Sequence, residues 1–211
     1  MILHGYWRSG ASYRVRIALN LKGIGYENAA HDLRKGEQKT PDYVALNPQG
    51  MVPALQVGDV VLTQSPAILE WLEETHPDPA LLPKGANDRA TVRAMAALIG
   101  CDIHPLNNLR VLKAIRSEFN ADQAAVDAWA ARWIAPGFDA LEALVARHGA
   151  GWSFGDAPTL VDCYLIPQMY SARRFNMDLS PWPPLLAVEQ TALTHPAFAS
   201  AHPDLQPDAD A

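Results

Sequence analysis

The sequence has few cysteines, no excess of basic residues and no long apolar segment. Only Cys101 and Cys163 are present, which is too few for a disulfide framework. No window of about twenty consecutive apolar residues could span a membrane, and the first residues lack the basic start and apolar run of a signal peptide. We therefore expect a cytoplasmic protein whose cysteines are free thiols.

The balance of charges also excludes classes of partner. Acidic side chains outnumber Lys and Arg by 23 to 17, and the formal net charge is -6 at pH 7. Nucleic acids and anionic lipid surfaces attract proteins that present a basic face. We expect neither a nucleic acid nor a membrane as partner, so an anionic small molecule would have to be bound by individual arginines.

Two regions of different pattern follow one another along the chain. Residues 1–76 alternate short strand-like and helical runs, whereas residues 88–200 show helical periodicity and are rich in Ala. The stretch HPDPALLPKGAND between them holds three prolines and a glycine, so we interpret it as an ordered linker. The sequence predicts an α/β domain over residues 1–80 and an all-helical domain over residues 88–211.

The first domain is predicted to run β-α-β-α-β-β-α. The expected elements are a strand ILHGY, a helix from Ser12 to Lys22, a strand GYENAAH, a short polar segment over residues 35–46, strands ALQV and VVLT around a Gly-Asp hairpin, and a helix over residues 65–76. Ser65 is expected to cap the last helix, with Pro66 at its first position. In the helical domain, Thr159 and Asp162 have the spacing of a capping box.

The turn WRSGAS stands directly before the first helix, where unpaired N–H groups and the helix dipole favour an anion. A serine hydroxyl there could donate a hydrogen bond to a bound thiolate and lower the pKa of that thiol. Helix capping is the plainer alternative. It is favoured for Ser12, and both interpretations stay open for Ser9.

Two further stretches could contact a ligand through their backbone. A cis peptide at Val52-Pro53 would expose the backbone of Val52 to an extended ligand, whereas a trans proline at the start of a strand needs none. Gln64-Ser65 opens another helix and so offers either a second anion site or a simple cap.

A metal site is not expected. Cys101 and His104 have ligand-like spacing, but three or four ligands are needed and no second pair accompanies them. We interpret Cys101 as a buried residue beside a polar His104.

The order of these features resembles the zeta class of glutathione transferases over essentially the whole chain. The resemblance is carried by WRSGASYRVRIALNLKG, LNPQGMVPAL, QSPAILEWLEE, SFGDAPTLVDCYLIPQ and the tail HPDLQPDA. It implies a thioredoxin-like first domain, a helical-bundle second domain and a homodimer. One departure stands out, because eukaryotic members usually have Ser-Ser-Cys in the turn and this chain has Ser9-Gly10-Ala11, so no protein thiol is available there.

The resemblance implies glutathione as cofactor and the cis–trans isomerisation of an unsaturated dicarboxylate. The Ser-Gly turn, CDIHPLNNLRVL and SARRF favour maleylpyruvate, an intermediate of gentisate degradation, as the substrate. Maleylacetoacetate is the alternative substrate. A general glutathione transferase and a non-catalytic binding protein are the alternative functions.

The resemblance also implies the site residues. Ser9 and Arg8 would be catalytic, with the Ser9 hydroxyl on the glutathione thiolate. Glutathione would further contact Ser12, Val52, Pro53, Gln64, Ser65, His104 and Asn108. Arg8, Arg110 and Arg174 would bind the substrate carboxylates, since the planar guanidinium suits a carboxylate. Arg173 competes with Arg174 for this role.

Overall fold

The computed structural model describes residues 1–210 and divides them into two compact units. The first unit combines Met1–Leu81 with the residues from Thr194 onward, and the second is Leu82–Leu193. The predicted boundary at the end of the helical domain is therefore wrong. The last residues belong to the first unit because their polar groups bind its N-terminal part. The Ala201 carbonyl, for example, accepts a hydrogen bond from the Arg16 guanidinium at 3.0 Å.

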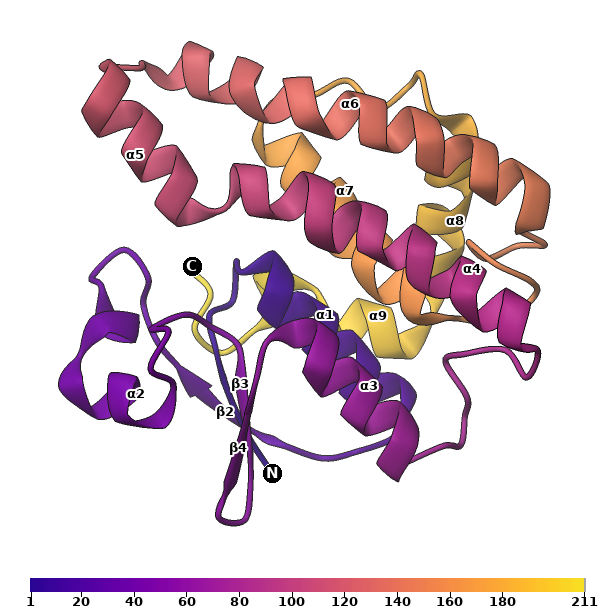
Figure 1. The fold of residues 1–211 in the computed structure, drawn as a ribbon, viewed down its shortest axis with the longest axis horizontal. Helices are drawn as coiled ribbons and strands as arrows, with labels where there is room; N and C mark the ends of the chain where they lie inside the picture. Colours follow the sequence, from indigo (N-terminus) through magenta and orange to yellow (C-terminus); the bar gives the residue numbers. More distant parts are fainter. Residues whose placement is uncertain (211) are drawn as a thin grey trace. The chain divides into compact units, whose positions relative to one another are not determined.

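The first unit has the predicted β-α-β-α-β-β-α order (Figure 1). Its elements are β1 (Ile2–Gly5), α1 (Gly10–Leu21), β2 (Glu27–Ala30), η1 (Glu37–Lys39), α2 (Pro41–Leu46), β3 (Ala54–Val57), β4 (Val60–Thr63), α3 (Ser65–Thr75), α9 (Pro196–Ala201) and η4 (Pro203–Leu205). The sheet has the order β2-β1-β3-β4, in which β1 and β2 are parallel and the other pairs antiparallel.

The register of the sheet brings distant segments of the chain to one edge. At the end of β1, Gly5 pairs with Ala30 and His4 pairs with Ala54, while Ala54 also pairs with Thr63. The end of β1, the end of β2, the start of β3 and the end of β4 thus lie together. The turn before α1, the loop after β2, the Val-Pro pair before β3 and the start of α3 are consequently neighbours at this edge.

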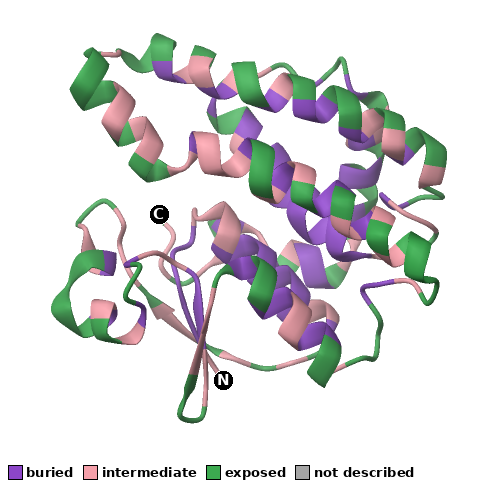
Figure 2. Ribbon diagram, viewed as in Figure 1, coloured by how far each residue is buried: buried purple, intermediate pink, exposed green. Residues whose placement is uncertain are grey.

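Helix α1 is the core element of the first unit and packs against α3 and α9. Most of its residues are buried, including Val15 and Ile17 (Figure 2). At its end the buried Lys22 ammonium contacts the Glu73 carboxylate of α3 at 2.6 Å and donates to the Pro79 carbonyl at 2.8 Å. The charge is paired and hydrogen-bonded, as a buried ammonium requires.

The second unit is helical, as predicted. Its elements are α4 (Ala86–Ala97), the π-helix η2 (Leu98–Ile103), η3 (His104–Asn107), α5 (Leu109–Phe119), α6 (Gln123–His148), α7 (Leu160–Arg174) and α8 (Pro183–Thr194), whose last residue is at the unit boundary. Figure 2 shows the contrast between the largely buried α7 and α5, which has no buried residue. Across residues 1–210, no helix is long and apolar enough to cross a membrane.

The predicted capping box at the start of α7 is confirmed. The N–H and the hydroxyl of Thr159 both donate to the Asp162 carboxylate, at 2.7 and 3.0 Å. The other carboxylate oxygen accepts from the Ser153 N–H at 2.9 Å. Burial raises the pKa of Asp162, and these donors oppose that effect.

Candidate functional site

The turn before α1 is closed by the Ser9 N–H, which donates to the Tyr6 carbonyl at 3.0 Å. Ser9 is the N-cap of α1, and its hydroxyl oxygen accepts from the Ser12 N–H at 3.2 Å. Capping uses only the oxygen as an acceptor, so the hydroxyl hydrogen is still available for an anion at the helix N-terminus. The two sequence interpretations of Ser9 are compatible.

Ser12 occupies a different environment. It is fully buried, and its hydroxyl oxygen accepts from the Tyr6 N–H at 3.4 Å. The structure thus gives Ser12 a packing position inside the turn, where a ligand does not reach its side chain. We leave it out of the binding set proposed below.

Arg8 lies at the centre of the same turn and is partly exposed. Its guanidinium lies over the Trp7 ring, 5.2 Å from the ring centroid. Within residues 1–210 the Arg8 side chain makes no hydrogen bond or ion pair. Its donors are therefore available for an anionic ligand at the edge of the sheet.

The Val52-Pro53 peptide is cis, which the sequence left open. The segment before it is fixed, because the Met51 carbonyl accepts from the Tyr43 hydroxyl and the Asn47 amide, both at 2.7 Å. In the described part of the chain, the Val52 N–H has no hydrogen-bond partner. Val52 is partly exposed, and its backbone donor lies at the same edge of the sheet as the turn that carries Ser9.

Helix α3 begins at Ser65, and its N-cap is Gln64 in a left-handed conformation with φ 66°. The expectation that Ser65 caps this helix is wrong, because Ser65 is buried and its hydroxyl accepts from the Arg14 guanidinium at 3.4 Å. Gln64 is exposed, and its amide donates to the side chain of Gln49. Sequence reasoning missed Gln49, although it lies in the quoted LNPQG stretch.

In the helical unit, three of the expected residues come from one short stretch. His104 opens η3 and is partly buried, Asn108 is the N-cap of α5 and accepts from the Val111 N–H at 3.2 Å, and Arg110 is exposed on the first turn. Cys101 is exposed, which corrects the expectation of a buried thiol. Cys101 lies in the π-helix η2, where the regular spacing of an α-helix does not predict which side chains are buried.

The structure separates Arg173 from Arg174. The two terminal guanidinium nitrogens of Arg173 donate to the Glu189 carboxylate of α8, one of them at 2.5 Å. The Glu189 side chain is only 8% exposed, so Arg173 neutralises a buried charge. Arg174 is exposed at the end of α7. Arg173 is therefore paired with Glu189, and the exposed Arg174 stays the candidate for a substrate carboxylate.

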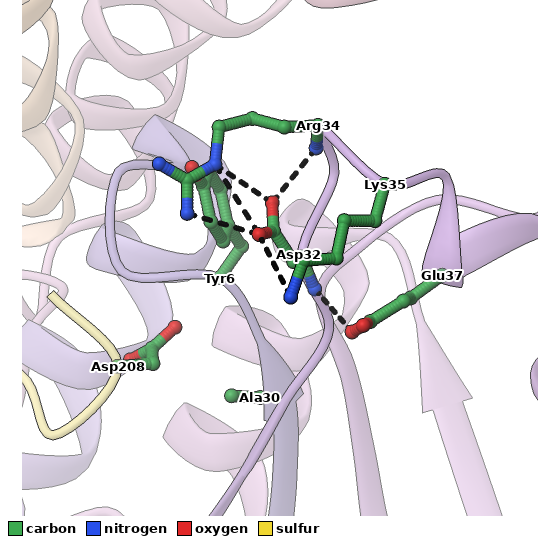
Figure 3. Close-up of a pocket in the computed structure, with 7 residues that line it drawn as sticks. All are labelled: Tyr6, Ala30, Asp32, Arg34, Lys35, Glu37 and Asp208. Atoms are coloured by element: carbon green, nitrogen blue, oxygen red, sulfur yellow. Dashed lines mark hydrogen bonds and ion pairs between the residues drawn. The ribbon is translucent and has the colours of Figure 1, made fainter. Parts of the chain in front are cut away.

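The loop after β2 forms a pocket of about 240 Å³ that the sequence did not predict (Figure 3). It is lined by Tyr6, Ala30, Asp32, Arg34, Lys35, Glu37 and Asp208. The Arg34 guanidinium makes a bidentate contact with Asp32 and holds the pKa of that carboxyl at about 2. Asp210 also accepts from Arg34, at 2.5 Å. These charges are largely paired with one another.

A cluster of aromatic and imidazole rings lies behind this loop. The His4 and His31 ring nitrogens are 3.1 Å apart, and the His31 ring is 4.4 Å from that of Tyr43. Burial, followed by the neighbouring His4, lowers the pKa of His31, while Glu37 opposes this change. Burial also raises the pKa of Tyr43 to about 12.

Comparison with known proteins identifies relatives of the chain. The model of the glutathione S-transferase N-terminal domain matches residues 8–75. A maleylpyruvate isomerase from Ralstonia sp. is 56% identical over 99% of both chains. The holo structure of a maleylpyruvate isomerase, described as a bacterial glutathione S-transferase of the zeta class, superposes with a TM-score of 0.98 at 55% identity over all of both chains.

A maleylacetoacetate isomerase from Anaeromyxobacter dehalogenans, solved with glutathione in its active site, has a TM-score of 0.90 at 45% identity, over 99% of this chain and 97% of that one. The chain belongs to the glutathione transferase family and, within it, to the zeta class with the maleylpyruvate and maleylacetoacetate isomerases. The resemblance found in the sequence and the fold class that it implied are confirmed.

Proposed function

We propose that the protein is a glutathione-dependent cis–trans isomerase that converts maleylpyruvate to fumarylpyruvate. The observation that carries this proposal is the turn before α1. There Ser9 caps the helix with a hydroxyl hydrogen still available, and Arg8 makes no hydrogen bond or ion pair within residues 1–210. A thiolate and a carboxylate are the two anions that such a turn suits. The strong similarity to maleylpyruvate isomerases supports the choice of substrate.

The residues of the first unit fit glutathione. An extended peptide needs a backbone partner, and the Val52 N–H beside Pro53 offers one. A carboxylate is favoured at the start of α3, where Gln64 is exposed and the first N–H groups of the helix lack intrahelical acceptors. His104 and Asn108 of the helical unit complete the proposed cofactor set.

When bound, glutathione would supply the nucleophile for reversible addition to the double bond conjugated with the ketone, which frees that bond to rotate. The Ser9 hydroxyl and the dipole of α1 would hold the thiol deprotonated, since both favour the anion. Arg8 would stabilise the negative charge that develops on the substrate during addition. Arg8, Arg110 and Arg174 would bind the two carboxylates and so orient the substrate.

The deciding experiment follows the ultraviolet absorbance of maleylpyruvate with the pure protein, with and without glutathione, and maleylacetoacetate in parallel. Conversion that requires glutathione and is much faster with maleylpyruvate would support the proposal. Faster conversion of maleylacetoacetate would select the alternative isomerase, whose glutathione-bound relative is 45% identical to this chain. Glutathione binding without turnover of either compound would contradict an isomerase.

We further propose that the protein acts in the cytoplasm as a homodimer, without nucleic-acid or membrane partners. Helix α5 supports an association between copies, because it carries apolar residues such as Leu109 and Phe119 and buries none of its residues in the described chain. Light scattering on the purified protein would give the mass of the particle, and a mass of one chain would contradict the dimer.

A further inference from the structure

The turn that carries Arg8 and Ser9 is held from outside by the C-terminal segment. The Trp7 N–H donates to the Asp208 carboxylate at 2.9 Å, and the Trp7 carbonyl accepts from the Arg16 guanidinium at 2.9 Å. Both polar backbone groups of Trp7 are thus bound to charged side chains. Hydrogen bonds of this kind are shorter and stronger than those between neutral groups.

Each of the two charged residues is itself fixed. Arg16 is 2% exposed, and it also donates to the Ala201 carbonyl at 3.0 Å while lying 5.3 Å from the centroid of the Tyr13 ring. The second carboxylate oxygen of Asp208 accepts from the Asn28 amide at 3.4 Å. The hydrogen bonds of Asp208 and Arg16 therefore connect the turn to β2 and to the segment after α9.

The C-terminal segment is in turn fastened to α1. The Asn20 amide donates to the Ala197 carbonyl at 3.0 Å and to the Ser200 hydroxyl at 3.1 Å. Gln206 closes the segment by donating to the Ser200 and His202 carbonyls, at 3.1 and 2.9 Å. The contacts of Asn20 and Gln206 thus fix the segment from which Asp208 reaches Trp7.

We infer that Asp208 and Arg16 are positioning residues, which fix the Trp7 backbone and thereby set the place of the Arg8 guanidinium and the Ser9 hydroxyl. This inference rests on the proposed function, because it assumes that these two side chains bind the substrate and the thiolate. The hydrogen bonds among Tyr6, Ser9 and Ser12 join the turn only to itself and to the start of α1, so they leave it free to shift as a unit. The two contacts to Trp7 remove that freedom, and small displacements of reacting groups are costly for rate.

The test compares Asp208→Ala and Asp208→Asn with the wild type. Asp204→Ala is the matched control, because Asp204 lies in the same segment and is exposed. Its carboxylate lies 3.8 Å from the His202 imidazole nitrogen and not at the turn that carries Arg8 and Ser9. The readouts are kcat/KM for maleylpyruvate, the pKa of the bound glutathione thiol from thiolate absorbance, and amide hydrogen exchange of residues 7–9. Thermal unfolding is recorded for every variant.

We expect Asp208→Ala to lower kcat/KM on the order of 10- to 100-fold, raise the pKa of the bound thiol and speed exchange of the Trp7 amide. Asp208→Asn keeps an oxygen acceptor for the Trp7 N–H and should lie between Ala and wild type. Asp204→Ala should match the wild type. Wild-type kcat/KM in Asp208→Ala would overturn the inference. So would a lower rate with an unchanged thiol pKa and unchanged Trp7 exchange, because the turn would then not have moved.

The hydrogen-exchange measurement separates this inference from the proposed function. If the wild type neither binds glutathione nor turns over the substrate, the proposed function fails. Faster Trp7 exchange in Asp208→Ala would then still show that Asp208 fixes the turn. Unchanged exchange would overturn the positioning role of Asp208.

Discussion

The hydroxyl oxygen of Ser9 accepts a hydrogen bond from the Ser12 N–H at 3.2 Å, so the residue proposed to bind the thiolate is also the N-cap of α1. The stability of α1 and the proposed binding of the thiolate therefore both depend on the Ser9 hydroxyl group. Any substitution of Ser9 changes both, and an experiment must separate the two effects.

Substitution of Ser9 by Ala and by Gly makes that separation. Ser9→Ala should cost about 1 kcal/mol of unfolding free energy through the lost cap, whereas Gly at an N-cap costs only a few tenths. Both variants lack the hydroxyl donor, so both should lose turnover to a similar extent and show a raised pKa of the bound thiol. Chemical denaturation and the pH profile of kcat/KM measure these quantities. Near-normal turnover in Ser9→Gly would show that only capping matters.

Arg8 is expected to act on the substrate and not on the cofactor. Arg8→Ala should raise KM or lower kcat for maleylpyruvate about tenfold or more, since a charge-assisted contact is lost, while the glutathione Kd stays close to normal. Arg147→Ala removes the same charge from an exposed position at the end of α6 and serves as the control. Steady-state kinetics and calorimetric titration with glutathione test this. Weaker glutathione binding with unchanged substrate kinetics would contradict the assignment.

The adjacent arginines of α7 should give opposite results. Arg173→Ala leaves the buried Glu189 carboxylate without its bidentate partner, and should lower stability by about 1 kcal/mol, a small value because Arg173 is 46% exposed. Arg174→Ala should raise KM for the dicarboxylate. Urea denaturation and kinetics on both variants measure the difference. A raised KM in Arg173→Ala alone would reverse the two roles.

His31 should make stability depend on pH. Burial and the nearby His4 lower its pKa below the ordinary value of 6.5. The unfolded chain therefore binds a proton at a pH where the folded chain resists it, and the unfolding free energy should fall as the pH drops below 6.5 toward the folded-state pKa. His31→Gln should flatten this fall, whereas His76→Gln, whose ring contacts Trp71, should not. Urea titrations between about pH 7.5 and 5 would reveal the slope. An identical slope in His31→Gln would refute the assignment.

Local patterns in the sequence were sufficient for much of the fold. The strands ALQV and VVLT begin and end where predicted, because two short strand-forming runs around a Gly-Asp turn determine a hairpin over short distances. The capping box of Thr159 and Asp162 is equally local. The family resemblance supplied the first unit's candidate residues, and the register of the sheet places their segments at one edge.

Contacts between distant residues were not predictable in this way. Trp7 and Asp208 are 201 positions apart, and no periodicity in either segment indicates the other. Arg16 stands in a stretch that alternates arginines with apolar residues, which suggests solvent exposure, yet its guanidinium is buried on two carbonyls. The cap of α3 was misplaced for a related reason, since Ser65 is bound to Arg14 and the left-handed Gln64 precedes it.

Because residues on both sides of the helical unit build the first unit, the order of synthesis matters for this protein. While the ribosome is still translating the helical unit, Trp7 lacks Asp208 and Arg16 lacks the Ala201 carbonyl. The N-terminal segment must therefore wait for the distal segment before its turn reaches the final conformation. Nascent chains halted before residue 196 should consequently bind glutathione poorly, however well their sheet has formed.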